Sequence, residues 1–148
     1  MANRIHAAGV LLENEDGEIL VFRRQPQNPE GNTWGLTGGK IKEGENTLQA
    51  LLRKVHAEIG YDIDPGNVRF VKTYHWDRED MDLIFDVFRL TDPASSAVTK
   101  LAADAHSEYL WATPQELYAR KDLMQGLYPI LSDTYNLRGH NDDSSPAA

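Results

Sequence analysis

The chain has 148 residues, a formal net charge of −8 and no cysteine, with 41% hydrophobic and 26% charged residues. This length suits one domain with a sizeable core, and the lack of thiols excludes disulfides, thiol catalysis and cysteine-ligated zinc. The negative charge argues against a nucleic-acid polymer as the main partner, although a local basic pocket can still bind a small anion.

The start of the chain predicts a pair of strands followed by a loop. Asp16-Gly17 separates two apolar runs, and Asp-Gly favours a tight hairpin turn. The expected strands lie at residues 6–12 and 18–24, and a polar loop is expected at 25–33.

The segment 48–59 predicts an amphipathic helix, because its apolar residues recur at helical spacing and form one stripe. Asn46 and Gln49 match a capping box at its start, and Gly60 suits its C-terminal end. Side-chain chemistry therefore predicts both ends of this helix.

The second half of the chain predicts further strands and two helices. The expected strands lie at 68–76, 83–90 and 109–111, with an acidic turn at 77–80 between the first two. Thr113 and Pro114 suit the cap and the first position of a helix, and a last amphipathic helix is expected at 123–135.

The alternation of the strand at 68–76 would place an aromatic set on one face of the sheet. Its members would be Phe70, Lys72, Tyr74 and Trp76. Such a face could stack a nucleotide base or pack within the sheet, and the sequence leaves both readings open.

Alternating strands with two or three helices predict the α/β class. Residues 1–137 are expected to form a single domain, while the polar residues 138–148 predict a disordered tail. No apolar run approaches the ~18 residues that a membrane span needs, and acidic residues interrupt the first apolar run, so no signal peptide is expected. A cytoplasmic location without membrane contact is the resulting prediction.

Residues 38–60 (GGKIKEGENTLQALLRKVHAEIG) resemble the Nudix box, the metal and diphosphate site of the Nudix hydrolases. The family pattern is G, five residues, E, seven residues, then R-E-U-x-E-E-x-G-U, where U is a bulky apolar residue. The residues that match it at the right spacing are Gly39, Glu45, Arg53, Val55, Glu58 and Gly60. Lys54 and Ala57 depart from it, because they stand where the family has glutamates.

Other stretches extend the resemblance over about residues 5–135. The matching segments are 22–24, 34–39, 108–111 and 114–117. The resemblance implies a Nudix-type α/β/α sandwich with a mixed sheet, and an enzyme similar to MutT. Thr37 stands where proline is usual, and we expect this difference to loosen the loop.

The resemblance also implies a reaction and a cofactor. Nudix enzymes hydrolyse a nucleoside diphosphate linked to another moiety, with Mg²⁺ or Mn²⁺ neutralising the diphosphate. By resemblance, Glu58 and the backbone of Gly38 would hold the metal. The expected catalytic residues are Glu58 and Lys54, the lysine because of its charge and not because of the family pattern. The expected substrate contacts are Gly38, Gly39, Lys40, Arg23 and Arg24, and the expected structural residues are Glu45, Arg53 and Gly60.

The charges at positions 54, 57 and 58 predict a weak metal site. They sum to zero here, from Lys54 and Glu58, where the family has three carboxylates. Two unit charges ~4 Å apart interact by about 4 kcal/mol at an effective dielectric of 20, so a lysine there opposes a dication. The Lys54 ammonium would instead take part of the metal's role.

Several alternatives stay open at this point. Glu58 could be a solvated helix glutamate paired with Lys54. Glu43, Asp104 and Glu108 could replace the missing acids or be surface carboxylates. The histidines show no metal-ligand spacing and receive no role: His6, His56, His75, His106 and His140.

Two functions follow from these residues. The first is hydrolysis of a nucleoside diphosphate derivative at a site with weakened metal binding. The alternative is an inactive Nudix domain that binds a nucleotide or sugar nucleotide as a sensor. Either function would involve a small nucleotide as the binding partner. Whether the chain forms a homodimer is left open, and these residues do not identify the substrate.

Overall fold

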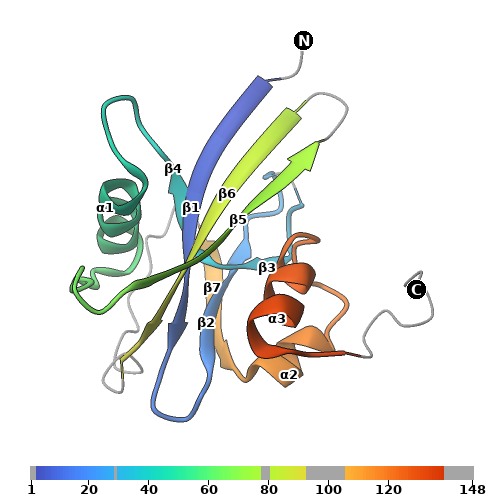
Figure 1. The fold of residues 1–148 in the computed structure, drawn as a ribbon. Coiled ribbons are helices and arrows are strands. Elements are labelled where there is room, and N and C mark those ends of the chain that lie inside the picture. The colour runs from blue at the N-terminus through green and yellow to red at the C-terminus, as the bar shows by residue number, and fades with distance from the viewer. Residues whose placement is uncertain (1–2, 29, 78–80, 93–105, 139–148) are drawn as a thin grey trace.

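The computed structural model describes residues 3–28, 30–77, 81–92 and 106–138 (Figure 1). In chain order the elements are β1 (Asn3–Glu13), β2 (Ile19–Arg24), β3 (Trp34–Gly35), β4 (Thr37–Lys40), α1 (Thr47–Ile59), β5 (Arg69–Asp77), β6 (Met81–Thr91), β7 (His106–Ala112), α2 (Pro114–Tyr118) and α3 (Leu127–Tyr135). The predicted turn at 77–80 lies largely outside the described residues, as does the predicted tail beyond Arg138.

The strands form one mixed sheet with the order β3-β2-β1-β6-β5, to which β4 adds on β1 and β7 on β2. β1 and β6 run parallel, and the other described pairs are antiparallel. α1 covers one face of this sheet, while α2 and α3 lie on the other face (Figure 1). The predicted α/β/α sandwich with a mixed sheet is therefore confirmed.

Each face of the sheet has its own apolar core. Leu51 and Val55 of α1 are fully buried against alternate residues of β1, while the α2/α3 face buries Leu11 and Leu131. Burial of one such side chain contributes roughly 1.5–3 kcal/mol. Because β1 is covered on both faces, its sequence is a continuous apolar run rather than an alternating one.

The predicted helix caps are present. The Asn46 side chain accepts a hydrogen bond from Gln49 N, and the Gln49 side chain accepts one from Asn46 N, both at 2.8 Å. Gly60 ends α1 in the left-handed conformation with φ +68°. Thr113 and Glu116 form a second capping box at α2.

The last helix begins later than the sequence predicts. Trp34 N donates to Asp122 O, and Met124 N donates to Trp34 O, both at 2.9 Å. Residues 122–124 thereby pair with the backbone of β3, so that α3 starts only at Leu127.

The predicted aromatic face of β5 is wrong for Phe70. The register between β5 and β6 shifts between Phe70 and Lys72, a β-bulge that turns Phe70 to the α1 side. There it meets Phe88 edge to face and lines a groove of about 450 Å³ near the start of α1, while 57% of it stays exposed.

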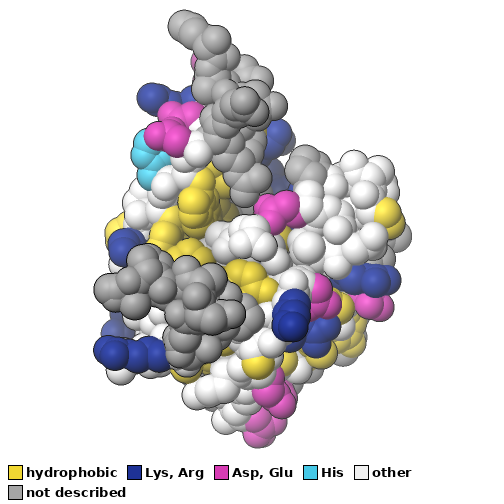
Figure 2. All heavy atoms as spheres, turned by 90° about the vertical axis from the view of Figure 1, so that its right-hand side faces the viewer, with side chains coloured by type: hydrophobic (Ala, Val, Ile, Leu, Met, Phe, Trp, Pro, Cys, Tyr) yellow, Lys and Arg dark blue, Asp and Glu magenta, His cyan; other side chains and the backbone are white. Residues whose placement is uncertain are grey.

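Tyr74 and Trp76 do share a face, the one toward α3. Their rings stack with centroids 5.8 Å apart, and Trp76 also lies 6.2 Å from Phe85. Tyr74 is buried and its hydroxyl donates to Asp133 of α3, so it packs within the sheet face. Figure 2 views the molecule from the right-hand side of Figure 1. Apolar side chains are exposed in the middle of this face, and charged side chains lie around them.

None of the described helices is long and apolar enough to cross a membrane.

Candidate active site

Glu58 joins α1 to residues 37–46, which comprise β4 and its connection to α1 and are called the glycine loop below. Its carboxylate Oε1 accepts a hydrogen bond from Thr37 Oγ1 at 2.7 Å and another from Gly38 N at 3.0 Å. The residue is only 6% exposed. The alternative of a solvated helix glutamate is therefore wrong, because a buried carboxylate needs hydrogen-bond donors and the loop supplies them.

Thr37 links the loop to α1. The side chain is fully buried, and its hydroxyl donates to Glu58. A proline at this position would have no such donor. This hydrogen bond opposes the expected loosening of the loop, which stays a prediction.

Gly38 and Gly39 bring the loop backbone close to its neighbours. Gly38 has φ +144°, and a Cβ there would lie 2.0 Å from Ala8 O on β1. A Cβ on Gly39 would lie 2.4 Å from Lys54 Cε. The stem of Lys54 thus runs along the loop at Gly39, which places this lysine beside the backbone that the sequence assigns to diphosphate binding.

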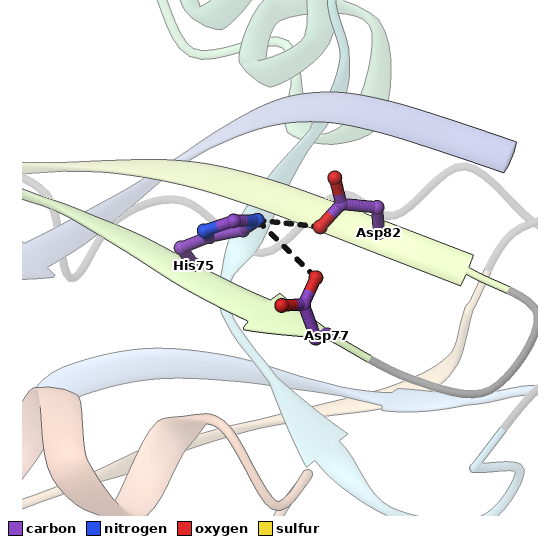
Figure 3. A group of neighbouring side chains, drawn as sticks. All are labelled: His75, Asp77 and Asp82. Atoms are coloured by element: carbon purple, nitrogen blue, oxygen red, sulfur yellow. Dashed lines mark hydrogen bonds and ion pairs between the residues drawn. The ribbon is translucent and has the colours of Figure 1, made fainter. Parts of the chain in front are cut away.

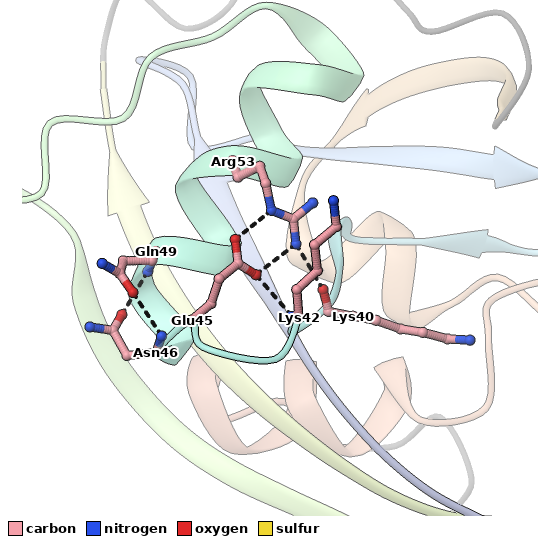
Figure 4. A network of polar contacts seen from close by, with 6 residues as sticks. All are labelled: Lys40, Lys42, Glu45, Asn46, Gln49 and Arg53. Carbon is pink, nitrogen blue, oxygen red and sulfur yellow. Dashed lines mark hydrogen bonds and ion pairs between the residues drawn. The ribbon is translucent and has the colours of Figure 1, made fainter.

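Glu45 and Arg53 form a second link between the loop and α1 (Figure 4). Arg53 Nε donates to Glu45 Oε2 at 2.6 Å, and an Arg53 NH₂ group donates to Glu45 Oε1 at 2.9 Å. Arg53 also donates to Lys40 O, while Glu45 accepts from Lys42 N. These hydrogen bonds, that from Arg53 above all, lower the pKa of Glu45 from 4.5 to about 2.

The two basic residues at the end of β2, Arg23 and Arg24, precede the glycine loop in the sequence. Arg23 pairs with Glu108 on the neighbouring strand β7, with Arg23 Nε 3.2 Å from Glu108 Oε1. Glu108 is thus the ion-pair partner of a residue assigned to phosphate contact. Arg24 is half-buried, and Glu43 is exposed in the loop before α1. Asp104 lies outside the described residues.

A family model described as NUDIX domain matches residues 3–134. The chain belongs to the Nudix family. The Nudix hydrolases are pyrophosphohydrolases that act on nucleoside diphosphate-linked substrates.

Relatives and solved structures agree with this membership. A CTP pyrophosphohydrolase of Escherichia coli is 25% identical over 112 residues, covering 76% of this chain and 78% of its own. A nucleoside triphosphatase, NudI, of Salmonella schwarzengrund is 29% identical over 115 residues, covering 72% and 80%. The crystal structure of a MutT protein from Methanosarcina mazei shares the fold with a TM-score of 0.78 at 23% identity, covering 93% of this chain and 98% of that one.

The Nudix family generally uses a divalent metal such as Mg²⁺ or Mn²⁺. The residues on α1 do not fit the three-carboxylate site that the family pattern describes. Ala57 is exposed and offers no ligand, while Lys54 brings a positive charge. Glu58 is the carboxylate that remains, and its Oε1 already accepts two hydrogen bonds from the loop. Mg²⁺ needs several hard oxygen ligands, which these three positions do not supply.

The Nudix pattern located the loop and α1 but missed two groups of side chains. Thr37 was not expected to bond to Glu58, which is 21 residues further along the chain. His75 was given no role, yet it lies beside Asp77 and Asp82. A His-x-Asp pair on one strand, followed by an Asp just across a hairpin, was the signal available in the sequence.

Proposed function

We propose that this chain hydrolyses the phosphoanhydride of a nucleoside triphosphate or a related nucleoside diphosphate derivative, at a site with weakened metal binding. The names of the two relatives, a CTP pyrophosphohydrolase and a nucleoside triphosphatase, support this substrate class. The observation that carries the proposal is the glycine loop held against α1 at both ends, by Glu58 and by Arg53, with Lys54 alongside it.

The loop would receive the diphosphate. At Gly38 the missing side chain lets β4 pack closely against β1, and at Gly39 it makes room for the stem of Lys54, so that this lysine lies directly against the backbone that would bind the diphosphate. The Lys54 side chain lies along Gly39, so its ammonium can neutralise part of the negative charge of the diphosphate, as a metal ion does elsewhere in the family. The further candidates for phosphate contact are Lys40, which is exposed next to Gly39 in the chain, and Arg23 and Arg24 at the end of β2.

The reaction would be attack of water on a phosphorus atom, with cleavage of the P–O bond to the leaving phosphate. Glu58 would position the loop through Thr37 and Gly38, and it is the acid that we propose for catalysis. We expect no Mg²⁺ site tighter than about millimolar in the free protein, because a lysine ammonium ~4 Å from a dication would repel it by about 4 kcal/mol or more at an effective dielectric of 20.

A second function is favoured by the side chains at positions 54 and 57. Lys54 and Ala57 remove two carboxylates while the loop stays anchored, an arrangement that suits nucleotide binding without hydrolysis. We further propose residues 1–137 as the extent of the domain. A homodimer and a cytoplasmic location stay predictions.

A substrate screen tests the proposed function. The protein is incubated with nucleoside di- and triphosphates and dinucleotide-linked compounds, with Mg²⁺ and with Mn²⁺, and the products are separated by ion exchange. We expect release of a nucleoside monophosphate from at least one triphosphate. Binding of a nucleotide by calorimetry without any turnover would refute hydrolysis and favour the sensor.

Matched variants locate the site. Lys54→Ala should raise KM for the best substrate, because it removes the ammonium beside Gly39. Arg69→Ala also removes one cation, an exposed one on β5, and should leave KM unchanged. Equal effects of the two variants would show that only the overall charge matters.

A further inference from the structure

A second group of ligand-type side chains lies at the end of the β5–β6 hairpin (Figure 3). His75 and Asp77 are two residues apart on β5 and point to the same face, and Asp82 stands directly opposite Asp77 on β6. His75 Nε2 lies 2.5 Å from Asp82 Oδ1 and 3.6 Å from Asp77 Oδ1. One ligand atom from each residue falls within 4.8 Å of the others.

The group places two carboxylates side by side, with His75 and Arg4 as their neighbours. Like charges directly opposite each other on neighbouring strands are destabilising, and here two carboxylates face each other. Arg4 approaches Asp82 at 3.3 Å but is 73% exposed on its side chain.

We propose that His75, Asp77 and Asp82 bind a divalent transition-metal ion of the Zn²⁺ type. The ligands would be His75 Nε2 and one oxygen from each carboxylate. Imidazole nitrogen suits Zn²⁺ and similar ions, whereas Mg²⁺ and Ca²⁺ prefer oxygen ligands alone.

The separations suit such an ion after small side-chain rotations. Zn–N and Zn–O bonds of about 2.0–2.2 Å in a tetrahedron put ligand atoms roughly 3.3 Å apart. The two distances from His75 Nε2, 2.5 Å and 3.6 Å, lie on either side of that value. The side chains of His75 and Asp77 are 53% and 81% exposed, so an ion reaches the group from solvent and water can complete its coordination.

This group is distinct from the proposed active site. Its ligands come from β5 and β6, whereas the proposed active site uses β4, α1 and the loop between them. The proposal of metal binding at the hairpin therefore does not depend on the proposed hydrolysis, and the two can be tested separately.

The direct test is a Zn²⁺ titration followed through the histidine ring nitrogens by NMR, with calorimetry for affinity. We expect the Nε2 resonance of His75 to shift first. His75→Ala should weaken binding at least tenfold, since even loss of a group that only orients a metal ligand costs about 10- to 100-fold. Asp77→Asn should do the same, and its exposed position keeps the fold intact.

The matched control is His56→Ala. His56 also contacts a carboxylate, with Nδ1 2.7 Å from Asp62 Oδ1, but among the described residues it belongs to no three-ligand group. This variant should bind Zn²⁺ as the wild type does. Arg4→Gln removes a competing cation and should tighten binding. An unmoved His75 resonance, or equal affinities for His75→Ala and His56→Ala, would overturn the proposal.

Discussion

Thr37→Val tests whether the loop is held through Glu58. Valine keeps the shape of the fully buried side chain and removes the hydroxyl that donates to Glu58 Oε1 at 2.7 Å. A hydrogen bond to a charged group contributes about 1.5–3 kcal/mol, so the free energy of unfolding should fall by about 2 kcal/mol. For a chain of this size that corresponds to a Tm lower by about 4–8 °C.

A double-mutant cycle in urea makes the test specific. Glu58→Ala leaves the hydroxyl of Thr37 and the N–H of Gly38 without their acceptor, and Thr37→Val in the same chain removes one of these orphaned donors. The double variant should therefore lose less than the sum of the single losses, by about 1 kcal/mol or more.

The control cycle pairs Glu58→Ala with Thr47→Val. Thr47 donates to Asp86 at 2.9 Å, so this is the same chemical change in a different hydrogen bond. The control pair should be additive within about 0.5 kcal/mol. Equal additivity for the Thr37 pair would refute the anchoring role of Thr37.

The other predictions concern catalysis, metal binding and pH. Glu58→Gln should lower turnover on the order of 10²-fold or more, and unchanged steady-state rates would place catalysis elsewhere. Lys54→Glu with Ala57→Glu changes the charge of the flank from zero to −3, so calorimetry should show tighter Mg²⁺ binding than in the wild type. No gain would mean that the side chains at 54, 57 and 58 do not converge. Because folding lowers the pKa of Glu45, its contribution to stability is present above pH 4.5 and is lost as the pH falls to about 2. The difference in unfolding free energy between wild type and Glu45→Gln should shrink across that window, and a constant difference would contradict the role of the Arg53 pair.

Local chemistry was readable in the sequence, and pairing between distant segments was not. Asn46 and Gln49 lie three residues apart, so their capping box could be predicted from side chains alone. The orientation of Phe70 could not, because the bulge beside it depends on the register with β6. The late start of α3 likewise depends on hydrogen bonds to Trp34.

The same division applies to the candidate site. The spacing of the motif located the loop and the pair Glu45 and Arg53, which are close in sequence. It did not reveal that Glu58 is buried against Thr37, since that contact exists only when α1 docks on β4. His75 and Asp82 face each other only because β5 and β6 pair.

The hydrogen bond from Gly38 N to Glu58 has a consequence for the dynamics of the loop. This amide can exchange its proton with solvent only when the bond opens, and we expect it to open when α1 and β4 separate. The loop and the helix should then behave as one cooperative unit in native-state hydrogen exchange, with the Gly38 amide as slow as the central amides of α1. A nucleotide that arrives at this loop would meet a preformed backbone and would not have to order it.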